Sequence, residues 1–76
     1  MKELLIYIAQ SLVEHPESVS VTEYETPAET VLELRVAPED MGKVIGKQGR
    51  IAKAIRTVVK AAAIHEDKKI IVEIVQ

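Results

Sequence analysis

The chain has 76 residues, of which 47% are hydrophobic and 29% are charged, with a formal net charge of −2 and no cysteine. A chain this short forms one domain at most, and it buries only ~60% of the surface that its unfolded form exposes. The absence of cysteine excludes disulfides, thiolate chemistry and cysteine-ligated zinc. The first residues are amphipathic at once, and no run of 18 apolar residues occurs. We therefore expect a cytoplasmic protein without a signal peptide or membrane span.

The small net charge conceals a strong asymmetry along the chain. Residues 1–40 contain nine acidic and two basic residues, whereas residues 41–76 contain three acidic and eight basic residues. Between Met41 and His65 there are six basic residues and no acidic one. A clustered basic patch indicates a nucleic-acid partner better than the isoelectric point of the whole chain does. A solvated basic helix face is the alternative explanation.

The first half of the chain predicts one helix and a β-hairpin. Residues 2–14 have apolar side chains at the i, i+3, i+4, i+7 spacing of an amphipathic helix, at Leu5, Ile8, Ala9 and Leu12. Pro16 ends this helix, because the residue before a proline avoids the α region. Residues 18–25 and 30–36 are rich in β-branched side chains and alternate in polarity, which predicts two strands. The four residues between them predict a hairpin loop.

The second half predicts two helices and a final strand. Pro38 suits the first position of a short helix, and Glu39 and Asp40 follow as helix-start residues, where negative charge meets the positive end of the dipole. A longer helix runs from about Arg50 to Ile64. Residues 70–75 are β-branched and predict the third strand. A connection that contains two helices places the second and third strands parallel, so we expect a mixed sheet in the order 1-2-3. One apolar sheet face then requires all three helices on that face, in an α+β fold.

The most informative stretch is the junction of the two central helices, Val44-Ile45-Gly46-Lys47-Gln48-Gly49-Arg50-Ile51. Two glycines three residues apart allow positive φ angles and a close backbone approach. The junction ends at a helix N-terminus, where free N–H groups and the helix dipole favour an anion. Lys47 and Arg50 add positive charge there. Alternatively, Gly46 is a plain helix C-cap and Gly49 a tight-turn residue.

With this junction, the sequence resembles the KH RNA-binding domain, whose hallmark is an Ile-Gly-x-x-Gly loop between two helices. The order helix-strand-strand-helix-helix-strand is similar to the bacterial type II KH fold, so the resemblance covers residues 1–76 as a single KH domain. The following stretch, Ala54-Ile55-Arg56-Thr57-Val58-Val59, is similar to that of the small bacterial KhpA-type KH proteins.

The resemblance implies binding of single-stranded RNA with little sequence preference, because the loop of this family clamps about four nucleotides. It also implies an RNA chaperone role and dimerisation, either as a homodimer or as a heterodimer with a larger KH-containing protein. On this basis we predict that the backbone clamp consists of Gly46, Lys47, Gln48 and Gly49. The predicted phosphate partners are Arg50, Lys53 and Lys43. The resemblance also implies an apolar floor for the bases, formed by Ile45, Ile51 and apolar atoms near Arg35, Val36 and Val72.

The helix after the loop suggests how a dimer forms. Its basic residues occupy one arc of about 120° at 100° per residue. We expect the opposite side to face the sheet, with Ile51, Ala54, Ile55, Val58 and Ala62. A third strip, Ala52, Val59 and Ala63, is then apolar and set beside the core. Small residues allow close approach of a second helix, so we predict this strip as the dimer interface; a wide core face is the alternative.

Other functions have little support in the sequence. His15 and His65 have no metal-ligand partners at a suitable spacing, and the serines lack a glycine elbow or a nearby histidine. We therefore expect no enzyme activity, no metal or other cofactor and no small-molecule substrate. An RNA-recognition motif needs aromatic side chains on its sheet, and the chain has only two tyrosines. The remaining alternative is a protein-interaction module that mainly dimerises with itself or another KH protein.

Overall fold

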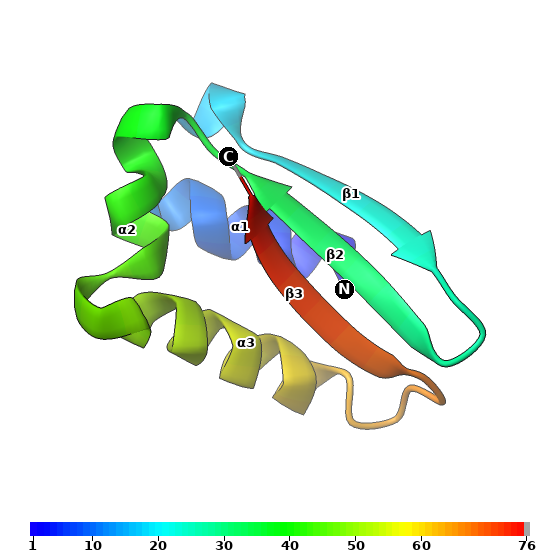
Figure 1. Ribbon diagram of the computed structural model, residues 1–76. Coiled ribbons are helices and arrows are strands. Elements are labelled where there is room, and N and C mark those ends of the chain that lie inside the picture. Colours follow the sequence, from blue (N-terminus) through cyan, green and yellow to red (C-terminus); the bar gives the residue numbers. More distant parts are fainter. Residues whose placement is uncertain (76) are drawn as a thin grey trace.

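The computed structural model describes residues 1–75. Three helices and three strands follow each other in the predicted order (Figure 1). The main elements are α1 (Lys2–Leu12), β1 (Ser20–Glu25), β2 (Glu29–Arg35), α2 (Met41–Ile45), α3 (Arg50–Ala62) and β3 (Lys69–Val75). Short 3₁₀ turns precede β1, α2 and α3, at Pro16–Ser18, Pro38–Asp40 and Lys47–Gly49. The α+β fold expected of a type II KH domain is confirmed.

The sheet has the predicted strand order, β1-β2-β3. β1 and β2 pair antiparallel with Val21 opposite Leu34, while β2 and β3 pair parallel with Leu32 opposite Val72. Parallel pairing is possible here because the connection from β2 to β3 contains both α2 and α3 and is long enough to cross over. β3 is therefore an outer strand, and α3 runs beside it (Figure 1).

One hydrophobic core joins the inner face of the sheet to all three helices. The sheet contributes Val21, Leu32, Leu34, Val36, Ile70 and Val72, and the helices contribute Leu5, Ala9, Val44, Ile55 and Val59. All three helices share this core, so they lie on one face of the sheet, as predicted. The opposite sheet face is left without a covering layer (Figure 1).

α1 ends at Leu12, two residues earlier than the sequence predicts. The reason is Asp40, whose side chain is 1% exposed. Its carboxylate accepts hydrogen bonds from the backbone N–H groups of Glu14, at 3.2 Å, and His15, at 2.9 Å. These amides therefore have an acceptor outside the helix. Asp40 immediately precedes α2, so the same contact anchors the start of that helix to the end of α1.

Candidate nucleic-acid interface

The Gly46–Gly49 loop has an unusual backbone conformation. Gly46 has φ 75° and ψ 174°, Gln48 has φ 58° and ψ 25°, and Gly49 has φ 75° and ψ 14°. Three of the four residues therefore have positive φ, which glycine adopts freely and other residues adopt at a cost. The backbone reverses sharply between α2 and α3, and the loop ends at the N-terminus of a 13-residue helix.

Gly46 is also needed for space. A Cβ atom built on Gly46 would lie 2.6 Å from Cγ1 and 2.9 Å from Cβ of Ile51, which is closer than real contacts allow. A Cβ atom on Gly49 would meet no atom within 4 Å. Ile51 thus packs beneath the loop. It supports the loop from below, but it is also partly exposed, so its part in an apolar floor for the bases stays a prediction.

The side chains around the loop differ in exposure and in whether they are paired with another side chain. Lys47, Gln48, Arg50 and Lys53 are all exposed. Arg50 Nη2 lies 3.5 Å from Gln48 Oε1, a weak contact at the edge of hydrogen-bonding distance. Lys43 is paired with Glu14, its Nζ 3.3 Å from Oε1. Glu14 is exposed and Lys43 is partly exposed, so the pair contributes little stability.

Ile45, a predicted member of the apolar floor, lies at the surface next to the loop. It is the last residue of α2, and its side chain is exposed. Val36 and Val72, near which the rest of the floor was predicted, are buried in the core. The apolar surface beside the loop is consequently smaller than the sequence predicts.

The predicted dimer strip is wrong, because its residues lie inside the core. Val59 is 0% exposed, Ala52 5% and Ala63 9%. Their places at the surface are taken by Ala54, Val58 and Ala62, which were predicted to face the sheet and are exposed instead. α3 is apolar over about 200° of its circumference. Such a wide arc can face the sheet with either half, and the structure uses the half that contains Ala52 and Val59.

The rotation of α3 leaves an apolar groove between α1 and α3. It has a volume of about 350 Å³ and is lined by Ile8, Leu12, Arg50, Ile51, Ala54, Ile55 and Val58. Val58 is 48% exposed and Leu12 38%. Arg50 is the single charged residue of the lining. An apolar groove of this kind suits a protein partner better than a phosphate backbone.

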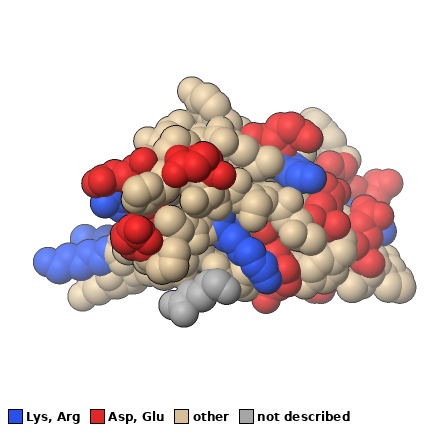
Figure 2. All heavy atoms as spheres, turned by 90° about the horizontal axis from the view of Figure 1, so that it is seen from above, with Lys and Arg blue, Asp and Glu red and all other residues tan. Residues whose placement is uncertain are grey.

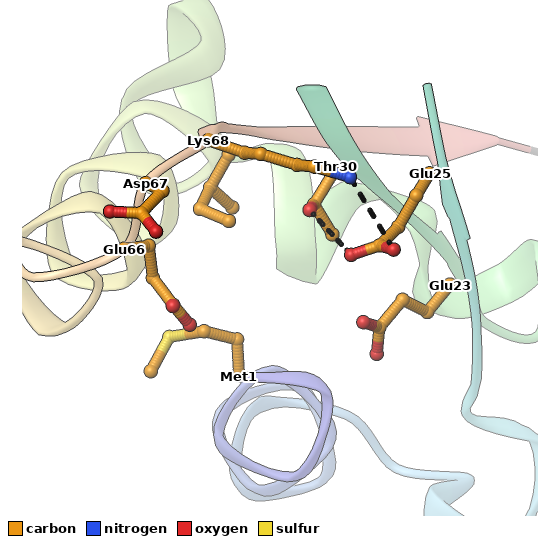
Figure 3. A pocket seen from close by; sticks show the side chains of 8 residues that line it. Met1, Glu23, Glu25, Thr30, Glu66, Asp67 and Lys68 are labelled. Carbon is orange, nitrogen blue, oxygen red and sulfur yellow. Dashed lines mark hydrogen bonds and ion pairs between the residues drawn. The ribbon is translucent and has the colours of Figure 1, made fainter. Parts of the chain in front are cut away.

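Acidic residues dominate other parts of the surface. Seen from above, this face shows several groups of red acidic side chains among mostly tan uncharged residues (Figure 2). A pocket of about 260 Å³ near the hairpin loop is lined by Met1, Glu23, Glu25, Thr30, Glu66, Asp67, Lys68 and Ile70 (Figure 3). Lys68 pairs with Glu25 at 3.5 Å, which leaves the other carboxylates of the pocket in excess. This pocket repels phosphate.

The uncovered sheet face also carries negative charge. Glu33 and Glu73 are directly opposite on β2 and β3. The Tyr24 hydroxyl donates to Glu33 Oε2 at 3.0 Å. This hydrogen bond, together with desolvation and the nearby charges of both glutamates, raises the pKa of Tyr24 above its ordinary value. The sheet face is therefore a poor surface for RNA, in agreement with the absence of an RNA-recognition motif in the sequence.

Sequence reasoning missed the roles of two residues. Asp40 was interpreted only as a helix-start residue, and no local pattern indicates that its acceptors would meet amides 25 and 26 residues away. Arg56 was placed on the basic arc of the helix, but its Nε donates to the backbone carbonyl of Val72 at 3.2 Å.

Among residues 1–75, no helix is long and apolar enough to cross a membrane, and no cluster of three His, Cys, Asp or Glu side chains could hold a metal ion.

Comparison with known proteins agrees with the fold. The family model described as "KhpA/KhpB, KH domain" matches residues 2–74. The chain belongs to the KhpA/KhpB family of KH domains. Among curated KhpA/KhpB relatives, RNA-binding protein KhpA of Clostridium perfringens is 68% identical over 75 residues, which are 99% of this chain and 100% of that protein. RNA-binding protein KhpA of Listeria monocytogenes is 54% identical over 76 residues, covering all of both chains.

A solved structure outside the KhpA/KhpB family has a similar fold. The crystal structure of Era in complex with MgGDPNP and nucleotides 1506–1542 of 16S ribosomal RNA has a TM-score of 0.60 and 23% sequence identity. The similarity covers 97% of this chain but only 30% of the Era chain. At this identity the likeness supports the KH-like fold and nothing further.

Proposed function

We propose that this chain is a cytoplasmic, non-catalytic binding protein for single-stranded RNA, in which residues 1–76 act as a single KH domain. The observation that carries the proposal is the Gly46–Gly49 loop, whose positive φ angles bring the backbone to the N-terminus of α3 beside exposed basic side chains. The names of the KhpA relatives support it.

The loop is proposed to act as a clamp on the RNA backbone. Gly46 and Gly49 let the phosphodiester chain approach closely, and the first N–H groups of α3 present donors and the positive end of the helix dipole. Lys47, Arg50 and Lys53 supply the positive charge, and Lys43 joins them when phosphate displaces Glu14. Contacts of this kind position the RNA without reading its sequence.

A double substitution tests the clamp. Replacing Lys47 and Gln48 together by Asp puts two carboxylates at the exposed loop tip, where phosphate is proposed to lie. We expect binding of a fluorescent decamer, measured by anisotropy at low salt, to fall below detection while the circular dichroism spectrum stays unchanged. The matched control, Ala28→Asp with Lys69→Asp, makes the same charge change at the other end of the molecule and should bind much more tightly. Equal loss in both variants would show that only net charge matters.

The salt dependence of binding provides a second test. If two to four phosphates are neutralised, log K should fall against log of the salt concentration with a slope of about −1.5 to −3, at ~0.7 per phosphate. A slope near zero would rule out backbone contacts as the main source of affinity.

A second candidate function is dimerisation with another KH domain, and the α1–α3 groove is the observation that favours it. The groove is lined by uncharged side chains apart from Arg50. In a two-fold contact the same patch meets itself, so a patch that carries little charge can associate without burying like charges. We propose that a second copy of this chain, or a KH domain with an equivalent face, covers this groove.

Light scattering at micromolar concentration tests the dimer. We expect the parent to be dimeric and Val58→Asp to be a folded monomer, because Val58 is half-exposed and tolerates charge in the free chain. A parent that scatters as a monomer, or a Val58→Asp variant that remains dimeric, would show that the α1–α3 groove is not a dimer contact.

A further inference from the structure

Arg56 is held at the outer edge of the sheet. β3 is the last strand in the sheet order, and Val72 lies at its middle. The Nε of Arg56 donates to the Val72 carbonyl oxygen at 3.2 Å, so the side chain crosses from α3 to this edge. Of the basic residues on α3, Arg56 is the only one with a hydrogen bond to β3 among residues 1–75. The bond fixes the direction of the guanidinium group.

The remaining N–H donors of the Arg56 guanidinium group are available for other hydrogen bonds. Arginine has five N–H donors in a planar fork, and the bond to Val72 uses one of them. The two terminal nitrogens of Arg56 have no hydrogen-bond or ion-pair partner among the described residues, and the residue is exposed. Arg35, Lys43 and Lys68, in contrast, are each paired with a glutamate. Arg56 keeps its full charge because its one partner is a neutral carbonyl.

The position of Arg56 relative to the loop suggests what it contacts. α3 begins at Arg50, directly after Gly49, and Arg56 is six residues further, which is about 9 Å along the helix axis. A backbone held at the loop and running along α3 therefore passes Arg56 within the span of about four nucleotides that such a loop holds. The residues at the loop itself face the phosphates, whereas Arg56 lies between α3 and the β3 edge.

We propose that Arg56 reads one base of the bound RNA, an inference that rests on the proposed RNA-binding function. A guanidinium fork with two free nitrogens fits a base that presents two adjacent acceptors. Guanine does so with O6 and N7, and cytosine does so with O2 and N3. Adenine and uracil alternate donors and acceptors on their edges and pair less well with a fork of donors. The chain then prefers G or C at one position and is permissive at the others.

The test compares four fluorescent RNA decamers by anisotropy: C10, U10, A10 and alternating UG. The full-length parent should bind C10 or the UG decamer about tenfold more tightly than U10 and A10. Arg56→Lys keeps the charge but not the fork, so the preference should fall to less than twofold. Lys60→Gln, one turn further along α3, should leave the preference ratio unchanged. Circular dichroism of each variant establishes that it is folded.

The outcomes separate this inference from the proposed function. A parent that binds all four decamers equally, or an Arg56→Lys variant that keeps the preference, overturns base reading while RNA binding stands. Loss of affinity by the same factor for all four RNAs in Arg56→Gln assigns Arg56 to phosphate contact and also overturns it. A parent that binds none of the decamers overturns both proposals.

Discussion

Substituting Ala for each of the two loop glycines gives a matched comparison of backbone strain and steric overlap. Gly46→Ala places a side chain at φ 75° and ψ 174°, a region that is almost exclusive to glycine and costs ~1–3 kcal/mol. The new Cβ also overlaps Ile51 at 2.6 Å, and overpacking costs typically ~1–3 kcal/mol. Gly49 has φ 75° and ψ 14°, and a Cβ atom there would lie in open space. Gly49→Ala therefore has only the conformational cost of placing a non-glycine residue in the left-handed region, ~1–2 kcal/mol.

We therefore expect Gly46→Ala to lower the free energy of unfolding by about 4 kcal/mol and Gly49→Ala by about 1 kcal/mol. A 76-residue domain has a total stability on the order of 4–11 kcal/mol. With a urea slope of ~1 kcal/mol per molar, Gly49→Ala should move the midpoint by about 1 M and Gly46→Ala by about 4 M. Urea titration followed by circular dichroism measures both.

A second substitution isolates the overlap. Ile51→Ala removes Cγ1 and Cδ1, two of the three atoms that a Cβ on Gly46 would meet. In the Gly46→Ala background it should therefore cost less stability than it does in the parent, with a favourable coupling of about 1–2 kcal/mol in the double-mutant cycle. If the two glycine variants are equally stable, or if the cycle shows no coupling, the steric part of the reasoning is refuted.

Three further predictions concern the rest of the fold. Asp40→Ala should lower the free energy of unfolding by about 3 kcal/mol, because two backbone amides lose their acceptor, and the melting temperature should fall by about 15 °C. Asp40→Asn keeps one acceptor oxygen and should lower the free energy of unfolding by roughly half as much. Val59→Asp should unfold the chain, since it buries an unpaired carboxylate at a cost of several kcal/mol, while Val58→Asp stays folded by circular dichroism. The pKa of Tyr24 in an absorbance titration should lie above 10.0, and Glu33→Gln should lower it. Because the folded-state pKa is raised, the stability linked to this group is present below pH ~10 and is lost as pH rises through the folded pKa. A Tyr24 that titrates at or below 10 would contradict the hydrogen bond.

Most of the fold could be predicted from the sequence because its signals are local. Apolar spacing, Pro16 and Pro38, and the β-branched runs gave the order of helices and strands, and the long connection between β2 and β3 gave their parallel pairing. The glycines at 46 and 49 marked the loop for the same reason, since positive φ is a requirement of the local backbone. The boundary of α1 was less accurate, because the acceptor for the amides after Leu12 comes from Asp40.

Only the tertiary structure decided which side of α3 faces the sheet. The helix is apolar over about 200°, so burial against the sheet is compatible with either half of the arc. The chain alone therefore could not assign Val59 to the core and Val58 to the surface, and it placed the dimer strip on the wrong side. The same holds for Arg56, whose contact with the Val72 carbonyl depends on the rotation of α3 against the edge of β3. Periodicity determines that a helix has an apolar face, whereas the rotation of a helix with an excess of apolar surface is set by the shape of the sheet against which it packs.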